Sequence, residues 1–176
     1  MKYLSLLLSA VLLLTNSSCQ DRGNAADNRM ETNEATAILS PTKGNNVRGI
    51  VTFTEVSDGV RVVAHVEGLT PGKHGFHIHE HGDCSAEDAS TAGGHFNPTN
   101  SKHGNYDSPE RHVGDLGNIE ANTQGVALYD RVDKVIKLSG DYSIIGRSVV
   151  VHTGEDDFVT QPTGNSGARA ACGVIR

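Results

Sequence analysis

The chain has 176 residues, of which 36% are hydrophobic, and it contains 20 glycines and no tryptophan. This composition is more typical of a small domain of short strands and loops than of a helical bundle. The formal net charge of −6 argues against a nucleic-acid-binding protein, which normally carries a basic surface, and we expect no nucleic-acid partner.

The N-terminus has the pattern of an export signal. Lys2 precedes an apolar stretch, residues 4–14, which is too short to span a bilayer and matches the apolar region of a signal peptide. Two serines then stand directly before Cys19, which resembles a bacterial lipoprotein signal, in which the cysteine becomes the lipidated first residue. We therefore expect a signal peptide over residues 1–18 and a lipid on Cys19. The alternative is an ordinary signal peptide cut near Cys19.

The segment after the signal is polar. It is rich in Asn, Asp, Glu and Arg and has little apolar surface to bury. We expect residues 19–36 to form a lipid-anchored tether and residues 37–176 to form the folded domain. The protein would then contact a membrane through its lipid and lie in the cell envelope, facing the periplasm or the cell surface.

From residue 47 onward, short apolar segments alternate with turn signals. In VRVVAHV, residues 60–66, every second residue is apolar, which predicts a half-buried strand. An all-β fold follows, namely a Greek-key antiparallel β-sandwich or barrel of about eight strands. The expected strands are residues 47–53, 60–66, 76–80, 117–121, 126–129, 135–138, 148–152 and 170–175.

Two segments are too long for simple turns. Residues 82–114 and 153–168 are rich in small and polar residues and show little strand pattern. Loops of this length in a small domain are usually functional or disordered. The first contains three histidines, which favours two long functional loops.

Histidines alternate along one predicted strand, in GFHIHEHGDC (residues 75–84). Side chains two residues apart on a strand point to the same face, so His77 and His79 would project side by side. His152 stands at the end of another predicted strand. Imidazole is a ligand for zinc, copper, iron and nickel, and these three residues would offer an imidazole-only site suited to copper.

The first long loop and the residue after it offer a second set of ligands. His95, His103 and His112 together with Asp115 could form a closed tetrahedral site of three nitrogens and one oxygen, which suits zinc. The alternative for each histidine is a solvated or hydrogen-bonded structural residue, and for His103 taken alone that alternative is the favoured one.

The cysteine count is consistent with export. The chain has three cysteines, an odd number for an exported protein. If Cys19 carries a lipid, Cys84 and Cys172 remain as a pair, and an oxidising compartment favours a disulfide between them. The alternative is two reduced buried thiols.

Several motifs together resemble the copper/zinc superoxide dismutases, over residues 47–175. They are GFHIHEHGDC, GGHFNP, KHG, RHVGDLGN, IIGRSVVVH and TGNSGARAACGVI. The resemblance implies copper binding by His77, His79, His95 and His152. It implies zinc binding by His95, His103, His112 and Asp115, so that His95 would bridge the two metals.

The same resemblance implies catalytic and structural roles. Arg169, in GARAACG, corresponds to the arginine beside the copper and would dock an anion through its guanidinium group. His95 would take up a proton and help to deliver it. Cys84 and Cys172 correspond to the family's disulfide.

The resemblance also implies a carboxylate that supports the metal ligands. Asp156 corresponds to the residue that links a copper ligand to a zinc ligand, here His77 and His103. The neighbouring Asp157 is the alternative for this role.

The leading hypothesis is a bacterial, lipoprotein-type member of this family. It would convert superoxide into dioxygen and hydrogen peroxide, with one copper and one zinc per subunit, in antioxidant defence of the cell envelope. The alternative is a non-catalytic copper- and zinc-binding lipoprotein on the same fold. Because Arg176 follows CGVI without the apolar tail that helps to close the animal dimer, both a homodimer and a monomer are compatible with the sequence.

Overall fold

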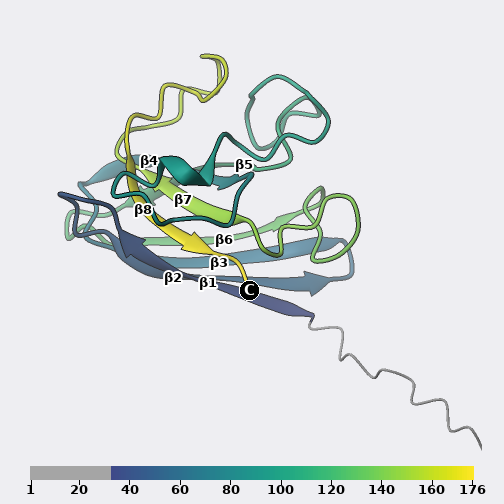
Figure 1. Ribbon diagram of the computed structural model, residues 1–176, viewed down its shortest axis with the longest axis horizontal. Helices are drawn as coiled ribbons and strands as arrows, with labels where there is room; N and C mark the ends of the chain where they lie inside the picture. Colours follow the sequence, from purple (N-terminus) through teal and green to yellow (C-terminus); the bar gives the residue numbers. More distant parts are fainter. Residues whose placement is uncertain (1–32) are drawn as a thin grey trace, which may run out of the picture. The chain divides into compact units, whose positions relative to one another are not determined.

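The computed structural model describes residues 33–176 (Figure 1). The predicted signal peptide, Cys19 and most of the predicted tether lie outside these residues. The strands are β1 (Glu34–Pro41), β2 (Arg48–Val56), β3 (Gly59–Glu67), β4 (Gly72–His79), β5 (Asp115–Ala121), β6 (Ala127–Asp133), β7 (Ser148–His152) and β8 (Arg169–Val174), with one short 3₁₀ helix, η1 (Ser90–Ala92). Within the described part of the chain, no helix is both long and apolar enough to cross a membrane.

The eight strands form a closed antiparallel barrel in the order β1-β2-β3-β6-β5-β4-β7-β8. Strands β4, β5 and β6 are neighbours, and β7 returns to lie beside β4 rather than beside β6. That return is the Greek-key arrangement. The predicted all-β Greek-key fold of about eight strands is therefore confirmed.

The barrel interior holds one apolar core. Along β3, Val60, Val62, Ala64 and Val66 are buried while the residues between them are exposed or partly exposed, as the alternation predicts. The largest fully buried side chains include Phe53 and Phe76. This core makes the sheet a rigid support for the loops outside it.

Two segments differ from the sequence-based expectation. Strand β1 was not predicted, and its first residues, 34–36, had been assigned to the tether; Ala35 is buried and pairs with Phe53 of β2. Residues 135–138 were expected to be a strand but belong to none. Their first amides, those of Val135 and Ile136, donate to the Asp133 carboxylate at 2.7 and 3.0 Å, which replaces the partners that a sheet would supply.

The two predicted long loops are present, over residues 80–114 and 153–168. Figure 1 shows both on the side of the barrel where β4, β7 and β8 run. The first loop packs on the outer face of the barrel through a small cluster that contains Ala89 and Ala92 of the loop and Val150 of β7.

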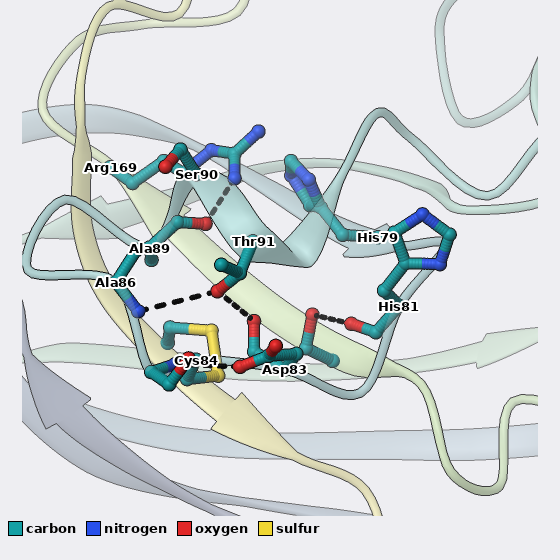
Figure 2. The surroundings of a disulfide bond; sticks show 12 residues. His79, His81, Asp83, Cys84, Ala86, Ala89, Ser90, Thr91 and Arg169 are labelled. Carbon is teal, nitrogen blue, oxygen red and sulfur yellow. Dashed lines mark hydrogen bonds between the residues drawn. A yellow bond between two sulfur atoms is a disulfide. The ribbon is translucent and has the colours of Figure 1, made fainter.

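A disulfide joins the first loop to the barrel. Cys84 in the loop and Cys172 in β8 are bonded, with 5.8 Å between their Cα atoms and a sequence separation of 88. Figure 2 shows the bond beneath the short segment that carries Ala89 and Thr91. The predicted pairing is confirmed, and it holds the loop against the strand that ends the domain.

Candidate metal centre

Strand β4 is buried on both of its faces. Phe76 and Ile78 point into the core, while His77 and His79 point outward and are covered by the loops, with 0% and 1% of their surfaces exposed. His77 pairs with Val150 of β7, so His152, two residues further along β7, reaches the same outer face. The alternation of histidines therefore serves a covered site on the outside of the barrel.

The ends of the first loop are tied to β4 by backbone hydrogen bonds. The amide of Phe96 donates to Ile78 O at 2.8 Å, and the amide of Ile78 donates to Gly114 O at 2.8 Å. A Cβ atom at residue 114 would lie 2.2 Å from Ile78 O, so only glycine permits this approach. The contact places His95 directly opposite His79, with which it forms an isolated antiparallel bridge.

These elements bring four histidines into one cluster. Ligand atoms of His77, His79, His95 and His152 all lie within 4.8 Å of one another, and all four residues are buried. The rings of His77 and His95 stack with centroids 4.0 Å apart. Three of them, His77, His79 and His152, are the residues for which the sequence pattern predicts an imidazole-only site, and the family resemblance adds His95.

A second cluster adjoins the first and shares His95. It contains His95, His103, His112 and Asp115. The carboxylate of Asp115 lies at its centre, 2.9 Å from His95 Nδ1, 3.0 Å from His103 Nδ1 and 3.3 Å from His112 Nδ1. The structure thus brings together all eight predicted ligand positions, with His95 counted in both sets.

The donor atoms fit metal ions. Two buried ring nitrogens, His77 Nδ1 and His95 Nε2, have no hydrogen-bond partner within residues 33–176. His103 Nδ1 lies 3.0 Å from the Asp115 carboxylate but makes no hydrogen bond to it. Such an atom costs about 1–3 kcal/mol when it is left without a partner. In addition, Nε2 of His79 and Nε2 of His152 face each other at 3.4 Å. Lone pairs that converge in this way are satisfied by a metal ion.

The opposite ring nitrogens are held by backbone carbonyls in the first cluster. His79 Nδ1 donates to Gly93 O at 3.0 Å, and His152 Nδ1 donates to Gly167 O at 3.2 Å. Each bond places the proton on Nδ1 and leaves the Nε2 lone pair free to bind a metal. The backbone of the loops therefore selects the tautomer that a ligand needs.

Asp156 connects the two clusters. Its Oδ2 accepts from His77 Nε2 at 2.7 Å and its Oδ1 accepts from His103 Nε2 at 2.9 Å. The side chain of Asn118 bonds to both the amide and the carbonyl of Asp156, at 2.8 and 2.9 Å. Asp157 instead bonds to Val159 and Thr160 in its own loop and is exposed.

Burial keeps three histidines of the first cluster, His79, His95 and His152, neutral. It lowers the pKa of His79 and the pKa of His152 well below the ordinary histidine value. Burial, and next to it the nearby His77, lowers the pKa of His95 to about 4. Neutral imidazoles are the form that binds metal ions.

The second cluster contains opposite charges. Burial alone would lower the pKa of His103, but the carboxylates of Asp115 and Asp156 outweigh it and raise that pKa to about 9. The pKa of Asp115 lies well below its usual range, against the effect of burial, because its histidine neighbours bond to the ionised form. A metal ion bound here would displace the proton of His103.

Arg169 lies at the edge of the first cluster. Its guanidinium group donates to the carbonyls of Ala89 and Gly93 in the first loop, and the bond to Ala89 is drawn in Figure 2. Gly93 O also accepts from His79 Nδ1, so Arg169 and His79 bond to the same carbonyl oxygen. The side chain is partly buried.

The other histidines have structural or solvated positions. His74 is buried, with Nδ1 2.9 Å from His152 O and Nε2 2.8 Å from Thr70 O. His65 and His81 are exposed. Sequence reasoning did not single out Asn118 or Gln161, which bond to backbone atoms of the site; an amide side chain in a strand or loop carries no spacing signal of its own.

Fold and site together define a Greek-key barrel with two adjoining metal-binding clusters on its outer face. Comparison with known proteins supplies the family. The sequence profile of the family described as "Copper/zinc superoxide dismutase (SODC)" matches residues 47–175. The chain belongs to this family; it is a superoxide dismutase, and its cofactors are copper and zinc.

Several relatives match most of the chain. A copper/zinc superoxide dismutase of Onchocerca volvulus is 46% identical over 83% of this chain and 96% of its own length. An extracellular copper/zinc superoxide dismutase of Drosophila melanogaster is 44% identical over 93% of this chain and 96% of its own length. The crystal structure of the clock protein EA4 superposes with a TM-score of 0.75 at 46% identity, over 82% of this chain and 94% of that one.

Proposed function

We propose that this superoxide dismutase binds copper through His77, His79, His95 and His152. Zinc is bound through His95, His103, His112 and Asp115. The observation that carries the assignment is the convergence of unpartnered ring nitrogens on one side of His95 and of the Asp115 carboxylate with three Nδ1 atoms on its other side. An all-imidazole set suits copper, and a closed set of three nitrogens and one oxygen suits zinc.

Copper, when bound, supplies the change of oxidation state that converts one superoxide to dioxygen and the next to hydrogen peroxide. The residues of the chain hold and orient the reactants. Strands β4 and β7 belong to the rigid barrel, so they would hold His77, His79 and His152 in place whether the charge of the copper rises or falls. His95 Nε2, buried and facing the first cluster, is the atom that can hold a proton and pass it to the peroxide product.

Arg169 docks the anionic substrate. Two of its guanidinium donors are fixed by the carbonyls of Ala89 and Gly93, which orients the planar group and leaves donors for a small anion. A protein that only stored the metals would not need this arginine. It therefore separates the enzyme from the alternative, a non-catalytic copper- and zinc-binding lipoprotein.

Replacing Arg169 with alanine tests this role. We expect Arg169→Ala to keep both metals but to lower kcat/KM for superoxide about ten- to a hundredfold, because a charge-assisted hydrogen bond contributes about 1.5–3 kcal/mol. Pulse radiolysis measures the rate, and elemental analysis measures the metals. Arg169→Lys keeps the positive charge but lacks the planar guanidinium group, so its kcat/KM should lie between those of the wild-type protein and Arg169→Ala. An unchanged rate in Arg169→Ala would remove the arginine from the mechanism.

The enzyme acts in the cell envelope in this proposal, held at a membrane by a lipid on Cys19 after cleavage of residues 1–18. The apolar stretch and the small residues before Cys19 support it. A relative carries the name extracellular superoxide dismutase, which is consistent with export. The disulfide between Cys84 and Cys172 also suits an oxidising compartment.

Lipidation is tested in a bacterial host that processes lipoproteins. We expect the full chain to incorporate labelled palmitate and to fractionate with membranes, because the acyl chains add apolar surface that inserts into the bilayer. Cys19→Ala should lose both properties, while Cys84→Ser, the matched control, should keep the label. A wild-type chain that is exported without the label would contradict the lipid anchor and leave ordinary secretion.

A further inference from the structure

A single side chain of the second long loop holds the backbone of His103 in the first. Gln161 Oε1 accepts from the His103 amide at 2.8 Å, and Gln161 Nε2 donates to the His103 carbonyl at 2.9 Å. The primary amide therefore matches both polar groups of one residue, as a neighbouring strand would. We call this pair of bonds the Gln161 clamp.

The loop around Gln161 is built to present the clamp. The carboxylate of Asp157 accepts from the amides of Val159 and Thr160, at 2.9 and 2.8 Å. The Thr160 hydroxyl donates to the same carboxylate at 2.6 Å, and the Gly164 amide donates to Thr160 O at 2.7 Å. These bonds close the turn on itself, so Gln161 extends from a fixed support rather than from a free loop.

The same loop also holds the ring of His103. Asp156 Oδ1 accepts from His103 Nε2 at 2.9 Å. The backbone of Gly164 lies against this contact, because a Cβ atom there would lie 1.9 Å from Asp156 Oδ1 and 2.5 Å from His103 Nε2. His103 is thus held at its ring by Asp156 and at its backbone by Gln161, and only Nδ1 remains to face the second cluster.

We propose that Gln161 is a positioning residue for zinc: its side-chain amide fixes the backbone of His103, so that Nδ1 stays aimed at the metal. This rests on the proposed assignment of His103 as a zinc ligand. His103 lies in a long loop with no strand partner. The carboxylates of Asp156 and Asp115 contact its ring, but the clamp is what bonds both polar groups of its own backbone. The first cluster has no member that bonds to Gln161 among the described residues, so copper should be insensitive to it.

Gln161→Met tests the clamp, because methionine keeps the length of glutamine but makes neither hydrogen bond. We expect zinc to leave the fully metallated protein about tenfold faster, at the low end of what partners of a metal ligand typically contribute. A chromophoric chelator reports the release. Copper retention and the melting temperature of the metal-free protein should stay at wild-type values. Cobalt placed in the zinc site should show an altered visible spectrum.

Gln124→Met is the matched control, because Gln124 is exposed and its side chain makes no hydrogen bond to any of residues 33–176. It should release zinc at the wild-type rate. Zinc release from Gln161→Met within twofold of wild type would overturn the proposal. So would an equal loss of copper and zinc accompanied by a lower melting temperature, since that result describes general destabilisation.

A measurement on the unaltered protein covers the case in which Gln161→Met does not fold. The His103 amide should exchange with solvent at least about tenfold more slowly than the amide of Lys102 beside it, for which no acceptor is present in the described structure. Equal exchange would show that the clamp is not formed. His103→Ala distinguishes failure of the zinc assignment from failure of the role of Gln161. If His103→Ala keeps a full complement of zinc, the zinc assignment itself fails. If it loses zinc while Gln161→Met does not, only the role of Gln161 fails.

Discussion

Replacing His95 with alanine is expected to reduce superoxide dismutation at least about a hundredfold. The residue belongs to both clusters, so each proposed metal loses a ligand in one substitution. Loss of a positioned proton donor alone typically costs 10²–10⁴-fold. The rate of the copper- and zinc-treated variant, measured by pulse radiolysis and divided by its copper content, checks this expectation.

His79→Ala is the control for this experiment, because His79 belongs only to the first cluster. It should lose copper and activity but retain zinc, whereas His95→Ala should weaken the binding of both. If His95→Ala kept both metals and the wild-type rate per copper, the bridging role of His95 would be wrong.

Removing the disulfide is expected to give the largest loss of stability among the substitutions considered. The bond joins cysteines with a sequence separation of 88, and disulfides typically stabilise a fold by about 2–4 kcal/mol. Cys172→Ser should lower the free energy of unfolding of the metal-free protein by that amount in a denaturant titration.

The same substitution has a second consequence at the site. Cys84 tethers the loop whose carbonyls, Ala89 O and Gly93 O, hold Arg169. We therefore expect Cys172→Ser to lower kcat/KM even when copper and zinc are both bound. Wild-type protein treated with a reductant should reproduce both effects. A stability change under about 1 kcal/mol, well below the typical range, would show that packing rather than the bond secures the loop.

The alternation of residue types along the predicted strands predicts much of the fold and of the metal centre. Alternating valines in residues 60–66 predict the inward face of β3, and alternating His77 and His79 predict one outward face of β4. Both predictions hold because a strand side chain can point only one of two ways. The cysteine count predicts the disulfide for a similar reason: if Cys19 carries a lipid, the two remaining cysteines leave a single pairing.

The unpredicted parts lack such a constraint. In β1 the buried positions include two alanines, whose weak apolar contrast hides the strand. Residues 135–138 carry strand-like residues, yet their first amides are bonded by the carboxylate of Asp133. A side chain that replaces a backbone partner leaves no period in the sequence, and Gln161 was missed for the same reason.

The sequence left a choice between Asp156 and Asp157 for the linking carboxylate. The structure places Asp156, fully buried, between His77 and His103. Asp157 is exposed and closes the turn beside it. Burial separates these two neighbours, and burial of adjacent loop residues depends on tertiary contacts that a single sequence does not display.

The central claim is that the four-histidine cluster holds a catalytic copper. The most direct test measures superoxide dismutation by the wild-type protein in two states, one loaded with zinc alone and one with copper and zinc. We predict turnover only in the second state, proportional to the copper bound and lost when copper is chelated. Full binding of both metals without turnover would contradict the claim and support a metal-binding protein on a dismutase barrel.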